Sequence, residues 1–266
     1  MGRLFSPRCA LVGMVHLLPL PGSPGWKGSM AEIEDRALGD ARALKEGGAD
    51  AILIENMGDL PYLNAHVDPE TVAAAAVLAR AAVREAGLPA GVQILAGANR
   101  EALGVAISAG LSFVRVEAFA YGHVADEGWI QASAGPLLRT RAALGAGQVK
   151  VWADVKKKHS AHAATADVDI GEFARGSVFC GADAVIVTGV STGSPASLEH
   201  VRAVREAVPE TPVVVGSGVE PDQAQALAAL CDAVVVGTWI KQGGDWRNPV
   251  ERERVARLKE AFARIA

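Results

Sequence analysis

One short sequence pattern recurs along the chain and constrains its fold more than any other feature. Residues 48–54 read GADAILI and residues 181–187 read GADAVIV, with looser copies at 110–116 and 231–236. In each copy an alanine-rich, helix-like stretch ends at or near a small residue, and a run of β-branched residues follows. Apolar runs of this kind are typical of strands that are buried on both faces of a parallel sheet.

Four further apolar runs lie between these copies, at residues 10–15, 91–95, 149–155 and 212–215. Each is followed by a helix-like segment, so strands and helices alternate along the whole chain, which is the pattern of a parallel sheet. Eight such units in 266 residues predict an α/β fold, a (β/α)₈ TIM barrel that forms a single domain over residues 1–266. An open doubly wound sheet is the alternative. Four recurrences of one strand-start pattern favour the closed barrel, and no G-x-G-x-x-G follows the first strand.

Three dipeptides indicate where helices begin. Asp68-Pro69, Ser194-Pro195 and Asn248-Pro249 each place a capping residue before a proline at the first helical position. The connections after the first, second, fourth, fifth and eighth strands are long, whereas those after the third and seventh are short. Long loops at the C-terminal face of a barrel carry catalytic residues, so we expect the functional site on that face.

Composition excludes several classes of function. The formal net charge of −4 lacks the basic excess that displaces counterions from nucleic acid, so no nucleic-acid partner is expected. No apolar run approaches the roughly 20 residues that span a bilayer, so no integral membrane association is expected either. Three cysteines without a C-x-x-C pair disfavour a disulfide framework and a thiolate zinc site. We expect a cytoplasmic protein, and a homo-oligomer stays open.

Polar or ionisable side chains stand at the ends of five predicted strands, in a chain otherwise rich in alanine and valine. Residues at the C-terminal ends of barrel strands surround the active site. Their convergence on one rim therefore favours an active site. The candidate catalytic residues are His16, Glu55, Glu117, Asp154 and Lys156, and the candidate substrate contacts are Asn56, Arg115, His159 and Thr188.

The fifth predicted strand shows the register best. Its odd-numbered positions from 151 to 155 are Val, Ala and Val and suit the helix-facing side, which leaves Asp154 and Lys156 on the barrel side. If the strand continues, Lys157 faces outward and Lys156 inward. Lys156 is therefore the lysine expected to act, as an electrophile, a Schiff-base former or a phosphate contact.

Structural roles compete with these functional ones. Asp154 and Lys156 could form a plain ion pair at the barrel mouth. Arg115 could simply neutralise Glu55 or Glu117 inside the barrel.

Glycines at the ends of the last two predicted strands favour anion binding. Residues 216–219 read GSGV and lead into a predicted helix near Pro221, and residues 237–238 read GT. Backbone N–H groups approach a ligand closely at glycine, a helix N-terminus favours negative charge, and barrels often build phosphate sites from these two loops. The alternative is that the glycines only permit tight turns. The predicted phosphate-binding residues are Ser217, Gly218, Gly237 and Thr238, with Gly193 of the sixth loop as a further donor.

A metal site has weaker support. His159 and His162 have workable ligand spacing, and with Asp154 and Glu117 they could hold a divalent ion. The first strand, however, carries a single His16 rather than the His-x-His pair that opens a zinc hydrolase barrel. We therefore predict no metal and no cofactor, and place His159 in a substrate-contacting loop.

Several motifs resemble those of one known family. Residues 13–24 read GMVHLLPLPGSP, residues 55–56 EN, residues 154–160 DVKKKHS, residues 188–193 TGVSTG and residues 216–218 GSG. Together they resemble the BtpA family through nearly the whole chain. The resemblance implies a TIM barrel similar to barrels of the ribulose-phosphate-binding type. It also implies a link to a cyanobacterial factor that is peripherally associated with thylakoids and is required for the accumulation of photosystem I. Other relatives are described as enzymes of sugar or nucleoside metabolism.

These observations lead to one main hypothesis and two alternatives. The main one is an enzyme, an isomerase, lyase or glycosyl transferase, that acts on a phosphorylated sugar or nucleotide-like molecule. Asp154 or Glu117 would act as base, His16 as acid, and Lys156 would stabilise developing negative charge. The alternatives are a non-catalytic photosystem I biogenesis factor and a sensor of a phosphorylated metabolite. The D-x-K of the fifth strand loosely resembles orotidine phosphate decarboxylases, but His159 stands where those enzymes have a further Asp, so that activity is not carried over.

Overall fold

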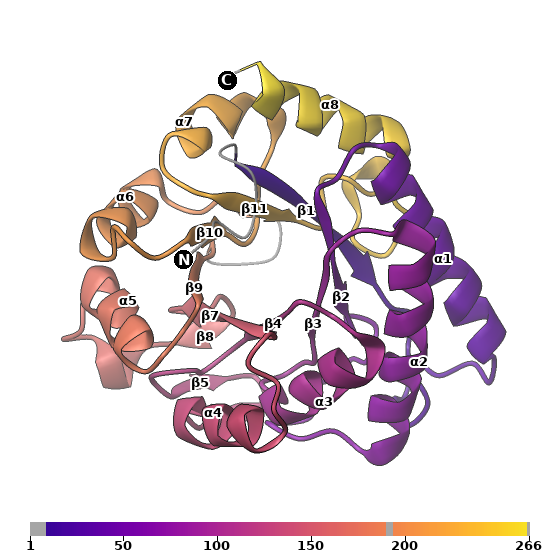
Figure 1. The fold of residues 1–266 in the computed structure, drawn as a ribbon, viewed down its shortest axis with the longest axis horizontal. Coiled ribbons are helices and arrows are strands. Elements are labelled where there is room, and N and C mark those ends of the chain that lie inside the picture. The colour runs from indigo at the N-terminus through magenta and orange to yellow at the C-terminus, as the bar shows by residue number, and fades with distance from the viewer. Residues whose placement is uncertain (1–8, 190–193, 265–266) are drawn as a thin grey trace.

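Eight parallel strands close into a barrel in the computed structural model, which describes residues 9–189 and 194–264 (Figure 1). The strands pair in the order β1-β11-β10-β9-β7-β4-β3-β2, and β2 pairs in turn with β1. Every apolar run that was expected to be a strand forms one, so the predicted TIM barrel is confirmed. The strands are β1 (Ala10–His16), β2 (Ala51–Glu55), β3 (Ala90–Gln93), β4 (Phe113–Val116), β7 (Lys150–Val155), β9 (Ala184–Val187), β10 (Val213–Val215) and β11 (Ala233–Val236).

Helices surround the barrel, as Figure 1 shows in a view close to the barrel axis. They are α1 (Met30–Glu46), α2 (Pro69–Ala86), α3 (Asn99–Ala109), α4 (Ala134–Ala143), α5 (Ile170–Phe179), α6 (Leu198–Ala207), α7 (Ala224–Ala228) and α8 (Arg252–Ala263). Three 3-10 turns lie in the connections, at η1 (Ala163–Thr165), η2 (Pro221–Gln223) and η3 (Gln242–Gly244). Over residues 9–189 and 194–264, no helix has both the length and the apolar character needed to cross a membrane.

One of the three predicted helix starts is confirmed and two are wrong. Helix α2 begins at Pro69 behind Asp68, as expected. Helix α6 instead begins at Leu198, because the Ser197 hydroxyl accepts the N–H of His200 and so caps the helix there. Helix α8 begins at Arg252, because the chain before it is held extended by a bridge between Lys241 and Val250.

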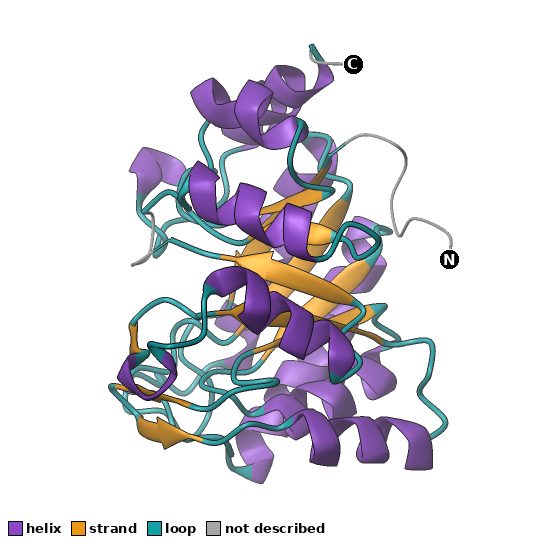
Figure 2. Ribbon diagram, turned by 90° about the vertical axis from the view of Figure 1, so that its left-hand side faces the viewer, coloured by secondary structure: helices purple, strands orange, loops and turns teal. Residues whose placement is uncertain are grey.

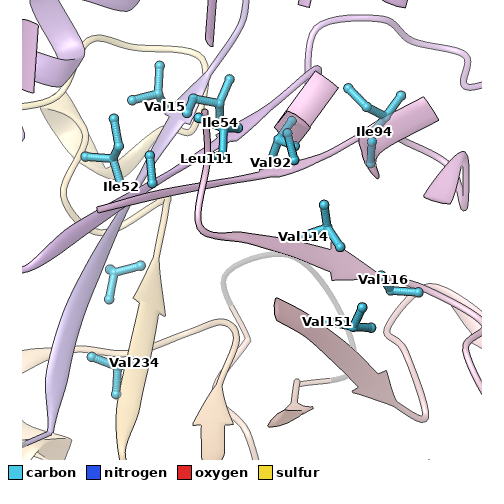
Figure 3. Packing of buried hydrophobic residues seen from close by; sticks show 14 of the residues in the cluster. Val15, Ile52, Ile54, Val92, Ile94, Leu111, Val114, Val116, Val151 and Val234 are labelled. Carbon is cyan, nitrogen blue, oxygen red and sulfur yellow. The ribbon is translucent and has the colours of Figure 1, made fainter. Parts of the chain in front are cut away.

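Alternate residues of each strand face opposite sides of the sheet and build two separate apolar layers. The inner layer fills the barrel and includes Val12, Phe113, Trp152, Ile186 and Val235. The outer layer packs beneath the helices and includes Val15, Ile52, Val92, Val114, Val151 and Val234 (Figure 3). The odd-numbered residues of β7 lie in this outer layer, so the register predicted for that strand as far as Val155 is confirmed.

A second, smaller sheet was not expected from the sequence. Antiparallel strands β5 (His123–Ala125), β6 (Gly128–Ile130) and β8 (Ser160–Ala161) form it from the long connections that follow β4 and β7. Figure 2 shows these short strands on the side of the barrel toward which the parallel strands point. The two connections are thereby joined over the part of the rim where the site was predicted.

Two aromatic rings stack inside the barrel, beside strand β3. Phe113 and Trp152 stack there with their ring centroids 3.9 Å apart. Gly91 lies against this stack, and a Cβ atom at its position would overlap the Phe113 ring. Because Phe113 is held against Trp152, the ring cannot move aside in a close-packed interior. The strand therefore needs a residue without a side chain at this point.

We expect Gly91→Ala to lower the free energy of unfolding by about 1–3 kcal/mol, since overpacking forces neighbouring side chains off their preferred rotamers. Gly39→Ala is the matched control, because an added carbon at Gly39 in α1 meets nothing within 4 Å. Alanine there should stabilise the helix by about 0.5–1 kcal/mol. Urea denaturation measures both variants. Equal stability of Gly91→Ala and the native chain would contradict the packing argument.

Candidate functional site

Two cavities adjoin at the C-terminal ends of the strands, because Glu55, Met57, Arg115 and Lys158 line both of them. The glycine cavity, of about 40 Å³, is further lined by Met14, His16, Gly216, Ser217, Gly218, Gly237 and Thr238. The carboxylate cavity, of about 240 Å³, is further lined by Leu60, Tyr62, Gln93, Leu95, Glu117, Asp126, Glu127, Lys157, His159 and Trp246. The rim predicted from strand ends is therefore a real concave site.

The glycine cavity contains the four described residues that were predicted to bind phosphate. Within the described residues, the backbone N–H groups of Gly218, Gly237 and Thr238 make no hydrogen bond, so they are free to donate to a ligand. The Ser217 hydroxyl accepts the N–H of Gly189 at 3.0 Å and donates to the carbonyl of Ser194 at 3.3 Å, which fixes the loop. The fifth predicted donor, Gly193, lies outside the described residues.

The loop after β10 differs from its predicted form in one respect. The expected helix near Pro221 is only the 3-10 turn η2 followed by the five-residue helix α7. A segment this short has little macrodipole, because the effect sums aligned peptide units along a helix. Any anion held here is therefore bound by backbone N–H groups and nearby side chains.

His16 ends β1 and is buried at the edge of the glycine cavity. Its Nδ1 lies 3.1 Å from the Trp246 carbonyl oxygen, which can only accept, so Nδ1 carries the hydrogen and Nε2 is left as an acceptor. A Cβ at Gly237 would lie 3.0 Å from Nε2, so that nitrogen faces the cavity wall. Burial lowers the pKa of His16 well below its usual value, and the nearby Lys241 and Lys158 cations lower it further. His16 is thus neutral and suited to accept a proton, the reverse of the acid role expected for it.

Arg115 and Asp154 form a buried ion pair between β4 and β7. Arg115 Nε lies 3.1 Å from Asp154 Oδ1, and its Nη2 lies 3.2 Å from Oδ2. Asp154 lines neither cavity. Burial raises the pKa of Asp154, although the Arg115 charge opposes the shift. Asp154 therefore holds Arg115 in place rather than standing free as a base, and the partner of Arg115 is neither Glu55 nor Glu117.

The expected positions of Lys156 and Lys157 are wrong. Strand β7 ends at Val155, and Lys156 takes a left-handed conformation with φ +47°, so the strand alternation stops before it. Lys156 consequently lines neither cavity. Lys157 lines the carboxylate cavity, and Lys158 lines both cavities. Lys157 is buried, where an outward-facing side chain was expected.

Glu117 is held by two neighbours in the carboxylate cavity. Gln93 Nε2 donates to one carboxylate oxygen at 3.1 Å, and Lys157 Nζ lies 3.2 Å from the other. Burial acts to lower the pKa of Lys157, but the carboxylates of Glu117 and Glu127 outweigh it and raise the pKa. Lys157 thus stays charged, and Glu117 is bound by two side chains, whereas a free base was predicted.

Glu55 and Lys158 line both cavities, and neither has such a partner among the described residues. Within the described residues, neither side chain makes a hydrogen bond or an ion pair. Burial raises the pKa of Glu55, against the opposing charge of Arg115. Burial lowers the pKa of Lys158, and Arg115 lowers it further. Each group is therefore shifted toward its neutral form, as in sites that transfer protons.

The chain's sequence is recognised along almost its whole length. The profile of the BtpA family matches residues 8–264. The chain belongs to the BtpA family. It is 43% identical to an uncharacterised mitochondrial protein of Caenorhabditis elegans, over 96% of this chain and 93% of that one. It is 33% identical to the photosystem I biogenesis protein BtpA of Synechocystis, over 97% of this chain and 90% of that one.

Solved structures agree on the fold. Orotidine 5'-monophosphate decarboxylase of Methanocaldococcus jannaschii superposes with a TM-score of 0.60 at 13% identity, over 95% of this chain and 98% of that one. Thiamine phosphate pyrophosphorylase of Pyrococcus furiosus superposes with a TM-score of 0.59 at 16% identity, over 97% of both chains. At these identities the likeness shows the TIM barrel that this BtpA-family chain adopts.

Two other predicted contacts of this BtpA-family chain are placed outside the cavities. Asn56 is buried beside them, where its Nδ2 donates to Asp59 and its Oδ1 accepts the N–H of Leu95, so it orders the loop after β2. Thr188 is also buried, packed beside Gly216. His159, in contrast, does line the carboxylate cavity.

A convergent metal-ligand set is not found in residues 9–189 and 194–264, where no three His, Cys, Asp or Glu side chains are arranged to hold an ion. His162 Nε2 lies 2.9 Å from the Lys157 carbonyl oxygen, so this nitrogen is already occupied. The predicted His159 and His162 pair therefore does not act as one ligand set.

The cavity residues that were not singled out from the sequence include Gln93, Glu127, Tyr62 and Trp246. Gln93 had a usable signal, since it ends β3 two residues after Gly91, on the same face of the strand. Glu127 is placed by the turn between β5 and β6, which the sequence analysis did not anticipate. Tyr62 and Trp246 come from long loops in which no periodic pattern indicates direction.

We expect Glu55→Gln to raise the free energy of unfolding at pH 7. Because the folded-state pKa of Glu55 is raised, ionisation costs stability as pH rises above the ordinary value of 4.5, and glutamine removes that cost. The gain should disappear below about pH 4, where the carboxyl is protonated in both states. Thermal unfolding from pH 3.5 to pH 8 measures the difference.

Asp154→Ala provides the contrasting variant, because it leaves Arg115 buried without its partner. Removing one member of such a pair costs about 3–5 kcal/mol. If Glu55→Gln were as destabilising as Asp154→Ala at pH 7, the description of Glu55 as an unpaired buried acid would be wrong.

Proposed function

We propose that the chain is an enzyme acting on a phosphorylated sugar or nucleotide-like small molecule. The phosphate would lie in the glycine cavity and the reacting part in the carboxylate cavity. The observation that carries the proposal is the junction of the two cavities at Glu55, Arg115 and Lys158. A ligand that spans both would place its reacting atoms beside Glu55 and Lys158, neither of which has a fixed partner in the described part of the chain.

The glycine cavity has the chemistry of a phosphate site. Free backbone N–H groups at Gly218, Gly237 and Thr238 supply donors, and Arg115 supplies positive charge. In TIM barrels phosphate sites are frequently built from the loops after the last two strands, which here follow β10 and β11. The names of the two structural neighbours, a decarboxylase of a nucleoside monophosphate and a pyrophosphorylase of thiamine phosphate, support a phosphorylated substrate.

His16 and Glu55 form a candidate acid and base pair. The raised pKa of Glu55 suits it to donate a proton, and the unprotonated Nε2 of neutral His16 suits it to accept one. The two residues end neighbouring strands β1 and β2, where they are paired in register. Isomerases, lyases and glycosyl transferases each need one group of each kind.

The photosystem I role named for the Synechocystis relative is not part of this proposal. A sensor of a phosphorylated metabolite would use the same two cavities without turnover. The two experiments that follow separate binding from catalysis.

A phosphorylated compound should bind more tightly than its unphosphorylated parent, by at least about 100-fold, or about 2.7 kcal/mol. Titration calorimetry with ribose 5-phosphate against ribose, and with glycerol 3-phosphate against glycerol, measures the ratio. Gly237→Ala should weaken phosphate binding at least about tenfold, because its Cβ would lie 2.9 Å from His16 Cε1 and crowd the cavity. Gly104→Ala in α3 is the control, since its added carbon meets nothing within 4 Å. Equal affinity for ribose and ribose 5-phosphate would overturn the phosphate site.

Turnover of a bound phosphorylated compound should depend on His16 and Glu55. We expect His16→Gln and Glu55→Gln each to lower kcat by about 100-fold or more, the usual contribution of a general acid or base. Binding of glycerol 3-phosphate should change little in Glu55→Gln, because the phosphate is held by backbone groups. Mass spectrometry of a phosphosugar panel measures turnover. Undiminished kcat in both variants would remove this acid and base pair from the reaction.

A further inference from the structure

Lys158 is placed unlike either of its lysine neighbours. Lys157 is bound to Glu117, and Lys156 lies outside both cavities. Lys158 lines both cavities at their junction and, within the described residues, its ammonium group makes no ion pair. A cation at the centre of a site, without a partner, is free to interact with a ligand.

The backbone is bent to bring this side chain inward. Lys156 and His159 have φ values of +47° and +53°, a left-handed conformation that is costly for residues with a side chain. These two residues flank Lys157 and Lys158 and turn both lysines back toward the barrel mouth. Unfavourable backbone conformations of this kind persist where surrounding structure enforces them, and they concentrate at functional sites.

The surroundings of Lys158 lower its pKa, which increases the share of neutral amine. Burial lowers the pKa of Lys158, and the fixed guanidinium of Arg115 lowers it further. The carboxylates of Glu55, Asp154 and Glu117 oppose this shift without cancelling it. Asp154 and Glu117 are already bound to Arg115 and Lys157, so their charges are largely balanced by those partners. A larger share of Lys158 is therefore nucleophilic near neutral pH than for an exposed lysine.

We propose that Lys158 forms a Schiff base with an aldehyde or ketone group of the phosphorylated substrate. This inference rests on the proposed function, because the glycine cavity must hold the phosphate that brings the carbonyl group to Lys158. It narrows the substrate class to phosphorylated carbonyl compounds, including sugar phosphates in their open-chain form.

The step balances with groups that the site contains. The neutral Nζ of Lys158 attacks the carbonyl carbon, and the oxygen takes the proton of the Glu55 carboxyl group. The new ammonium nitrogen returns one proton to Glu55. That proton then goes to the hydroxyl, which leaves as water as the nitrogen lone pair forms the C=N bond. The products are a protonated imine, water and the ionised Glu55 carboxylate.

The protonated imine favours particular reactions over others. It withdraws electrons from the neighbouring carbon, so a proton on that carbon can be removed or a carbon–carbon bond to it can break. His16 Nε2 is the acceptor available for such a proton. A carbon–carbon lyase or an isomerase therefore fits this chemistry better than a glycosyl transferase.

Reductive trapping tests the proposal. The intact chain is incubated with glyceraldehyde 3-phosphate, dihydroxyacetone phosphate or ribose 5-phosphate in the presence of cyanoborohydride, which delivers hydride to the imine carbon. Peptide mass spectrometry then locates the adduct. We expect the adduct at Lys158, at least about tenfold above any other lysine and at least about tenfold above the level with unphosphorylated glyceraldehyde.

Two arginine variants provide the comparison, since arginine keeps the positive charge but forms no Schiff base. Lys158→Arg should lose the adduct, with binding of glycerol 3-phosphate changed less than about threefold. Lys156→Arg, the neighbouring lysine outside the cavities, should retain both the adduct and the binding.

The outcomes separate the two proposals. If glycerol 3-phosphate binds but no carbonyl compound labels Lys158 selectively, the Schiff base is wrong and the proposed function stands. Uniform labelling of exposed lysines has the same meaning. If neither glycerol 3-phosphate nor any of the three carbonyl compounds binds, the proposed function is wrong. The Schiff-base proposal is then wrong as well, because it depends on that function.

Discussion

The ion pair between Arg115 and Asp154 sets the charge balance of the barrel mouth. It is almost fully buried, and its guanidinium is fixed between β4 and β7 by three contacts of 3.1 to 3.3 Å. The Arg115 charge also acts on Glu55 and Lys158, and for each of them its effect exceeds that of Asp154. It lowers the pKa of Lys158 and limits the rise in that of Glu55. The chemical character of both cavities therefore depends on a pair of which only Arg115 lines them.

The barrel could be predicted from the sequence because its strands are buried on both faces. Such strands are continuous apolar runs, and a run like that at 184–187 is recognisable without knowing its partners. Residues at strand ends could be placed too, since alternation fixes the direction of Arg115 and Asp154 relative to each other. The strand order and the concave rim follow from these two regularities together.

The remaining part of the site depends on backbone geometry that residue types do not reveal. A left-handed residue is signalled by glycine, but Lys156 adopts that conformation without one. Extrapolating the strand by one residue therefore assigned Lys156 the inward position that Lys158 occupies. The sheet of β5, β6 and β8 was missed for a related reason, because its strands are two or three residues long and their pairing joins two distant loops. Ligand-facing residues such as Glu127 depend on that pairing.

Strands at different positions around the barrel contribute different chemical groups to the site. Adjacent strands β10 and β11 contribute backbone donors and no carboxylate, whereas the neighbouring strands β2, β3 and β4 deliver Glu55, Gln93 and the residues before Glu117. An anion is thus favoured on one side of the mouth and a neutral, polar group on the other. The turn after β7 places Lys158 between them, close to Arg115. An amine in that position contacts the part of a ligand that lies next to the phosphate group. If the phosphate group serves only to anchor the ligand, the bond that reacts must lie in this neighbouring part.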